Sequence, residues 1–216
     1  MTEDTGDFES MHLTKSRLES LSDGIFAFAM TLLVIGLNLP DKSAIVPSQD
    51  YAMNLLLSLY SDFFHYVLAF LILGAFWLSH YVVLHPLRCM DRVYVWINLM
   101  TLLFVALLPF STSFSGDFPG VTLGAIVFEL NLFAIGMAIV LQWKYATGNH
   151  RLVEPDLDPR FVRHVSIRTL VVPGLSALGI IIALTGSNFS QMVYLFVPLV
   201  GFLISQWEKA QDRSTS

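Results

Sequence analysis

Residues 17–38 read RLESLSDGIFAFAMTLLVIGLN, and this stretch decides how the rest of the sequence is interpreted. Beyond Asp23 it contains no charged side chain before the apolar run ends at Pro40. About 20 apolar residues of α-helix span the hydrocarbon core of a bilayer, so we predict a transmembrane helix over residues 18–39. The acidic residues that precede this helix differ from the basic start of a signal peptide. We therefore expect the helix to stay in the mature protein.

The composition predicts that several such helices are present. Hydrophobic residues make up 55% of the 216 residues and charged residues 13%, about half the charged share of a soluble domain. Further apolar runs cover residues 62–84, 93–109, 121–145, 170–185 and 191–207, with an amphipathic lead-in at 53–59 and an ordered connector expected at 146–168. We predict an all-α polytopic membrane protein with six transmembrane helices in one domain, 17–207, between an acidic N-terminal segment, 1–16, and a tail, 208–216.

The Lys and Arg residues predict the direction of these helices. Loops on the cytoplasmic side of membrane proteins carry most of the positive charge. With the N-terminus inside, all of the 12 Lys and Arg residues except Lys42 fall on the cytoplasmic side. We therefore expect both termini in the cytoplasm and a multi-pass protein of the plasma membrane.

Several classes of function have no support in the sequence. The net charge of −5 gives no electrostatic footprint for nucleic acid, and a single cysteine, Cys89, cannot build an intrachain disulfide or a thiolate cluster. No hydrolase elbow, P-loop, dinucleotide or zinc motif is present. His65 and His80 lie about 22 Å apart along one predicted helix, too far to be the two axial ligands of one haem. We expect no enzyme activity, catalytic residue, metal site or cofactor.

Polar side chains on three predicted helices fall at a similar depth near the cytoplasmic side. Asp23 lies more than one turn inside the first helix, Trp77 and His80 share a face near the end of the second, and Asn98 lies near the start of the third. Polar groups inside a membrane need partners. Singly, Trp77 is typical of an interfacial anchor and His80 of a structural residue, but together the four residues predict a structural hydrogen-bond network between helices.

A second polar set lies toward the outer side. Asp62 and His65 begin the second predicted helix, and Glu129 lies well inside the fourth. An intramembrane carboxyl group is either a proton or cation site or a hydrogen-bonded structural acid. The sequence leaves both alternatives open for Glu129.

One stripe runs along the first predicted helix. Its members follow each other at spacings of four, three, four and three residues: Gly24, Phe28, Thr31, Ile35 and Asn38. This spacing places them on one face, which fits a packing seam as well as the wall of a pore. Apolar lining does not exclude ion passage, because hydrophobic constrictions gate channels by dewetting.

The first-helix motif resembles a known family. Residues 17–24, RLESLSDG, are similar to the R-x-x-x-F-S-D-G signature of the transmembrane protein 175 family, and the continuation IFAFAMTLLV is typical of its prokaryotic members. The WLSH sequence at 77–80 and the run from Asn98 to Leu107-Leu108-Pro109-Phe110 also resemble that family. The resemblance extends over all six predicted helices.

The resemblance implies a passive potassium channel that assembles as a homotetramer around four first helices. In such a channel Phe28, Thr31 and Ile35 form the constriction and selectivity region, and Gly24 and Asn38 lie at its mouths. The implied structural network comprises Arg17, Ser22, Asp23, Gly24, Trp77, His80 and Asn98. The implied partners are other copies of the chain, membrane lipid and permeant potassium ions.

The sequence departs from the family pattern at two positions. Leu21 replaces the motif phenylalanine and keeps an apolar side chain. Phe28 stands where the family more often has isoleucine or leucine, so a ring of four phenylalanines would be narrower or would present aromatic faces to a cation. The runner-up hypothesis is a proton-conducting channel or proton-coupled transporter that uses Glu129, Asp62 and His65.

Overall fold

The computed structural model describes residues 15–37, 48–118, 120–186, 190–196 and 206. Its elements, with η for 3-10 helices, are α1 (Lys15–Leu32), η1 (Leu33–Gly36), α2 (Gln49–Ser58), α3 (Tyr60–Leu84), α4 (Arg92–Asp117), α5 (Thr122–Thr147), η2 (Gly148–His150), α6 (Pro159–Thr169), α7 (Val171–Leu184) and η3 (Ser190–Phe196). The described part contains no β-strand, only an isolated bridge between Leu87 and Val153. The predicted all-α fold class is therefore confirmed.

Five helical stretches are long and apolar enough to cross a bilayer: Lys15–Gly36, Asp62–Leu84, Arg92–Asp117, Thr122–His150 and Pro159–Leu184. They correspond to the first five predicted helices. The sixth, predicted at 191–207, falls largely outside the described residues, which include only its start as η3. The terminal segments 1–14 and 208–216 also lie outside the described part.

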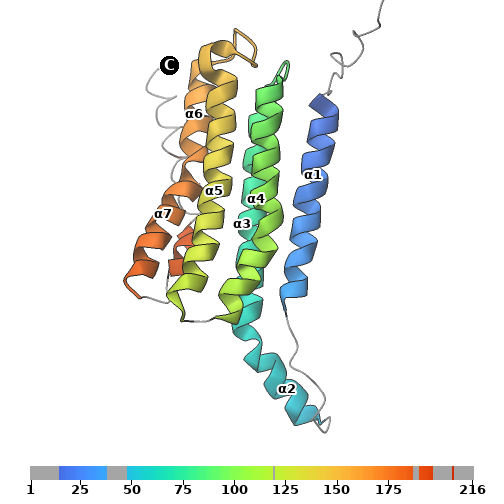
Figure 1. Cartoon of the computed structure of the whole chain (residues 1–216), viewed down its shortest axis with the longest axis vertical. Coiled ribbons are helices and arrows are strands. Elements are labelled where there is room, and N and C mark those ends of the chain that lie inside the picture. The colour runs from blue at the N-terminus through green and yellow to red at the C-terminus, as the bar shows by residue number, and fades with distance from the viewer. Residues whose placement is uncertain (1–14, 38–47, 119, 187–189, 197–205, 207–216) are drawn as a thin grey trace, which may run out of the picture.

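The long helices run up and down in one bundle (Figure 1). The start of α1, the end of α3, the start of α4 and the end of α5 meet at one end of the bundle, together with α6. This end gathers the cationic residues predicted to face the cytoplasm, among them Lys15, Arg88, Arg92, Lys144 and Arg151. The opposite end carries α2. The alternation expected from the charge pattern is thus present in the bundle.

Side-chain caps fix where two of these helices begin. The Asp91 carboxylate accepts a hydrogen bond from the backbone N–H of Tyr94 at 2.8 Å, and Asp158 accepts one from the N–H of Arg160 at 2.8 Å. Both satisfy N–H groups that lack a partner inside the helix. Pro159 follows Asp158 at a position where its missing N–H costs nothing.

One predicted boundary was wrong. The third helix was expected to end near Pro109, but α4 continues through this proline to Asp117. Pro109 has no N–H for the carbonyl of Val105, a loss that packing against neighbouring helices allows a membrane helix to tolerate. The hydroxyl groups of Ser111 and Thr112 donate to another carbonyl of the same turn, that of Leu108, at 3.0 and 2.9 Å. The ordered connector expected at 146–168 contains helix α6 from Pro159, and α7 corresponds to the fifth predicted helix at 170–185. Helices α6 and α7 stack along α5 (Figure 1).

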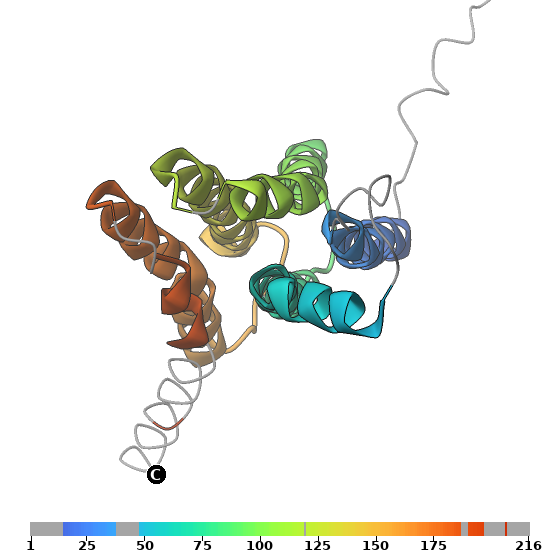
Figure 2. The same cartoon turned by 90° about the horizontal axis from the view of Figure 1, so that it is seen from below.

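The bundle has α1 at one edge and α7 at the opposite edge (Figure 2). Helix α5 lies against both α4 and α7, and close packing with α7 depends on two glycines. A Cβ atom at Gly136 would lie 2.5 Å from the ring of Pro173, and one at Gly179 would lie 2.5 Å from the carboxyl group of Glu129. The edge position of α1 leaves one of its faces uncovered by its own subunit.

Candidate functional site

Helix α1 has one face that packs on its own subunit. The side chains of Leu18, Ser22, Phe26, Ala29 and Leu33 are buried, and their spacing of three or four residues places them along one side. They contact α3 and α4, and the Phe26 ring lies 5.4 Å from the imidazole of His80. The packing seam of α1 is therefore this face.

The predicted stripe lies on the other face of α1. Gly24 and Thr31 are exposed, Phe28 is 64% exposed and Ile35 is 68% exposed. Asn38, the last member, lies outside the described residues. The stripe does not serve as a packing seam within the subunit, so its large apolar side chains face either lipid or another copy of the chain.

Two members of the stripe, Gly24 and Thr31, differ from the large apolar side chains around them. A side chain at Gly24 would meet no atom within 4 Å, so the subunit itself does not require glycine there. The Thr31 hydroxyl donates to the carbonyl of Phe28 at 2.7 Å, which leaves the lone pairs of its oxygen directed away from the helix. Thr31 thus presents an acceptor on an otherwise apolar face.

Next to the stripe, the structure brings five predicted polar residues into contact in two groups. In the buried group, the Asn98 amide donates to Ser22 Oγ at 3.2 Å, and its oxygen lies 2.7 Å from His80 Nε2. Because this oxygen only accepts, Nε2 carries the proton. In the surface group, Trp77 Nε1 donates to Asp23 Oδ1 at 2.8 Å. Both groups tie α1 to the helices beside it.

Arg17 is not part of either group. Its side chain is exposed and makes no ion pair with another described residue. The neighbouring Lys15 instead anchors the start of α1 by donating to the carbonyls of His85 and Leu87 at 2.6 and 3.2 Å.

Sequence reasoning missed two members of the buried group. Gln142 of α5 donates to Thr101 Oγ1 at 2.7 Å and to Asn98 Oδ1 at 3.3 Å. Both Gln142 and Thr101 are fully buried. A glutamine inside an apolar run is a detectable signal, because an amide inside a membrane needs a partner. Gln142 lies about 40 residues from Asn98 in the sequence, so the sequence alone does not show that the two side chains are partners.

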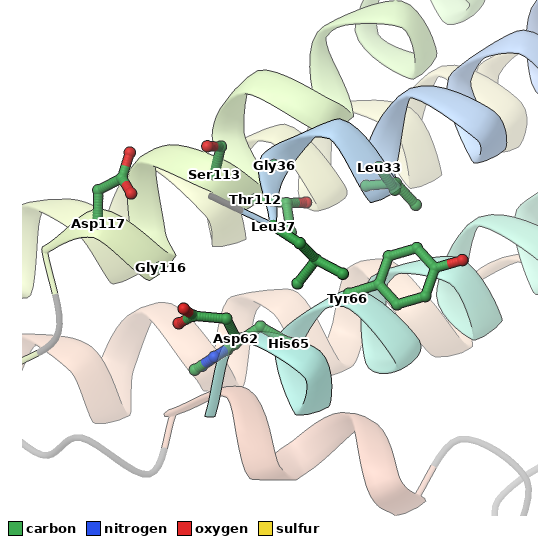
Figure 3. Close-up of a pocket in the computed structure, with 10 residues that line it drawn as sticks. All are labelled: Leu33, Gly36, Leu37, Asp62, His65, Tyr66, Thr112, Ser113, Gly116 and Asp117. Carbon is green, nitrogen blue, oxygen red and sulfur yellow. The ribbon is translucent and has the colours of Figure 1, made fainter. Parts of the chain in front are cut away.

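Asp62 and His65 lie in a small pocket at the end of the bundle near α2 (Figure 3). Together with Gly36 of η1 and Thr112 and Asp117 of α4, they line a cavity of about 60 Å³. Glu129 does not line this pocket. The structure therefore does not gather the three residues of the proton hypothesis in one site.

Glu129 is fully buried between α5, α7 and η3. Its Oε2 bonds with the hydroxyl of Tyr194, which also lies 2.9 Å from Ser176 Oγ. Ser176 donates in turn to the carbonyl of Val172 at 3.0 Å. Glu129 Oε1 is buried without a hydrogen-bond partner among the described residues.

Among the residues that the structure describes, no three His, Cys, Asp or Glu side chains gather where a metal ion could be held. The polar clusters near α1 contain amides, hydroxyls, an imidazole, an indole and the carboxylate of Asp23. The arrangement can position helices and present an exposed face of α1.

Comparisons with known proteins agree with this geometry. The family model described as endosomal/lysosomal potassium channel TMEM175 matches residues 17–109. A potassium channel of Streptomyces collinus is 28% identical over 70% of this chain and 74% of its own length. The endosomal/lysosomal proton channel TMEM175 of Rattus norvegicus is 26% identical over 87% of this chain but only 37% of its own length.

A solved structure shares the fold. The crystal structure of a lysosomal potassium-selective channel TMEM175 homolog from Chamaesiphon minutus superimposes with a TM-score of 0.71 and 22% identity, over 90% of this chain and 97% of that one. With its apolar spans, the chain is a multi-pass membrane protein. The three comparisons lead to one conclusion: residues 17–109 match the TMEM175 family, the chain is similar to a bacterial potassium channel, and its fold is that of a solved TMEM175 homolog.

Proposed function

We propose that this chain is the subunit of a potassium-selective channel in which first helices from four copies surround a central pore. The main observation is that Phe28 and Thr31 of α1 and Ile35 of η1 lie on the face of the first span that its own subunit leaves uncovered. The names of the bacterial relatives and of the family support potassium as the permeant ion. The site of function is the plasma membrane.

The pore requires several copies because the stripe lies on the outside of a single subunit. One helix face cannot enclose an ion path, whereas equivalent faces around a symmetry axis can. Closed rotational symmetry is the usual arrangement of homo-oligomers, and a homotetramer places four α1 helices around the axis. The room around Gly24 supports this arrangement, since a small residue allows close approach of a neighbouring helix.

Conduction would be limited at Phe28. A ring of phenylalanine side chains forms an apolar constriction that loses its water when narrow, and such dewetting closes a pore without a moving plug. One turn further outward, the oxygen of Thr31 offers an acceptor to a cation that has lost part of its hydration. Ile35 continues the apolar wall beyond the threonine.

The test is ion flux through purified protein in liposomes. Replacing Phe28 by Ala widens the constriction, so we expect a several-fold change in potassium flux or in the preference for potassium over sodium. Phe110→Ala is the matched control, because Phe110 is 59% exposed on α4 and lies outside the stripe. Equal effects of the two substitutions, or no effect of Phe28→Ala on flux, would contradict the pore.

Subunit number has a separate readout. The mass of the purified protein, measured by native mass spectrometry in detergent, should correspond to four chains of 24.2 kDa. A monomer that conducts potassium would overturn the shared pore, because the stripe would then face lipid.

A second candidate, proton conduction, is favoured by one observation. The buried carboxyl group of Glu129 bonds with Tyr194, and a titratable group in this position is a recurrent element of proton pathways. The rat relative is named a proton channel. Under this candidate Glu129→Gln abolishes proton flux and leaves the response to Phe28→Ala unchanged. If Glu129→Gln alters neither proton nor potassium flux, the carboxyl group has a structural role.

A further inference from the structure

A groove of about 450 Å³ lies between α3 and α6, at the end of the bundle that carries most of the cationic residues. Helix α3 contributes Leu78, Ser79 and Val82, and α6 contributes Phe161, His164, Val165, Arg168 and Thr169. The five positions on α6 follow helical spacing and form one continuous face. We call this site the α3–α6 groove.

The α3–α6 groove joins two kinds of surface. Apart from Ser79, its α3 wall is apolar and open to the surroundings, with Leu78 58% exposed and Val82 exposed. Its α6 wall carries an imidazole and a guanidinium group, His164 and Arg168. An apolar groove with a cationic rim matches the shape and charge of a phospholipid. The acyl chain of the lipid needs the apolar wall, and its phosphate needs the cationic rim.

The depth of Arg168 strengthens this match. Helix α7, which follows directly, has 14 residues, about 21 Å of helix, whereas the hydrocarbon core of a bilayer is about 30 Å thick. The end of α6 that holds Arg168 therefore lies at or inside the boundary of that core. At that depth a cation is stabilised by every anion, water or protein group that reaches it.

We propose that the α3–α6 groove binds an anionic phospholipid, with its phosphate at Arg168 and His164 and an acyl chain along Leu78 and Val82. Arg168 already takes part in another interaction within the protein. A guanidinium has five N–H donors, so it retains capacity for phosphate oxygens. The Thr169 hydroxyl bonds to the carbonyl of Ser166 at 3.1 Å, which leaves phosphate recognition to the two basic side chains.

The preference of the groove for an anionic headgroup is tested on the full-length protein. Delipidated protein in detergent is titrated with phosphatidylglycerol or with phosphatidylcholine of the same acyl chains, and bound lipid is counted by native mass spectrometry. Arg168→Gln should weaken phosphatidylglycerol binding about fivefold, the contribution of one basic residue near an anionic surface. Arg160→Gln is the matched control, since Arg160 lies on α6 but outside the groove, and it should leave the affinity unchanged.

The acyl-chain side is tested by filling the groove. Leu78→Trp should weaken phosphatidylglycerol binding, whereas Leu71→Trp, at a position 64% exposed on the same helix and outside the groove, should not. Both positions are exposed, so both variants should fold, and circular dichroism checks this.

Three results would overturn the proposal. Equal losses for Arg168→Gln and Arg160→Gln would mean nonspecific attraction to α6. Displacement of phosphatidylglycerol by millimolar inorganic phosphate would mean that the groove is an anion site without lipid preference. A change in oligomer mass with Leu78→Trp, without a change in lipid binding, would mean that a second copy of the chain fills the groove.

Discussion

Trp77 Nε1 on α3 donates a 2.8 Å hydrogen bond to Asp23 Oδ1 on α1, while the adjacent Ser22 accepts from Asn98 of α4 inside the bundle. Two consecutive residues of α1 are thus held by two different helices. A shift of one residue turns a helix face by about 100°, so these two contacts determine which side of α1 stays uncovered. The outward direction of Phe28 and Thr31 follows from them.

The indole–carboxylate contact should contribute measurably to stability. Trp77→Phe removes the N–H donor and keeps an aromatic ring, and we expect a loss of about 0.6–1.7 kcal/mol, from the mean to the maximum measured for hydrogen bonds between helices of a membrane bundle. Thermal unfolding followed by size-exclusion chromatography measures this loss. Trp96→Phe, at an exposed position of α4, is the control. A variant that keeps full stability yet loses potassium preference would contradict a structural role for the contact.

Asn98 should be more sensitive than Trp77, because it is buried and bonds with three side chains. Asn98→Leu removes the bonds to His80, Ser22 and Gln142 and leaves the buried N–H of His80 without its acceptor. We expect a loss of about 2–3 kcal/mol. The double substitution of Asn98 and Gln142 by Leu should lower the stability by less than the sum of the two single substitutions. The reason is that the bond between the two amides is lost only once. Strict additivity of the two losses would argue against a shared network.

Thr31 should control ion preference with little effect on assembly. Thr31→Val keeps the shape of the side chain and removes the oxygen, so the preference for potassium over sodium should fall several-fold in liposome flux assays. Thr31→Ser retains the oxygen and should keep the preference. If the two variants had the same preference for potassium over sodium, the hydroxyl group of Thr31 would have no role in selectivity.

The close packing of α5 on α7 should depend on Gly136. A methyl group there would lie 2.5 Å from the Pro173 ring, so Gly136→Ala should destabilise the protein by about 1–3 kcal/mol through overpacking. Gly174 is the control on α7, because a Cβ atom there meets nothing within 4 Å. Gly174→Ala should leave stability unchanged or raise it, since alanine favours helix. The melting temperatures of both variants test this pair.

The sequence predicted the five spans that the described residues contain and the resemblance to the TMEM175 family. The uninterrupted apolar run after Asp23 predicted the first span, and the placement of Lys and Arg predicted the alternation found in the bundle. Helical spacing also placed Gly24, Phe28, Thr31 and Ile35 on one face. These features depend on local composition and periodicity, which are available from the chain alone.

Only the tertiary structure decided which face of α1 packs and which stays open. Periodicity fixes the positions of residues relative to each other on a helix, but the rotation of that helix is set by contacts with distant segments, here Trp77 and Asn98. The same reason explains why the bond between Gln142 and Thr101 and the meeting of α3 with α6 in a groove were not predicted. Helices far apart in the chain come together through shape and hydrogen-bond complementarity, which no single segment encodes.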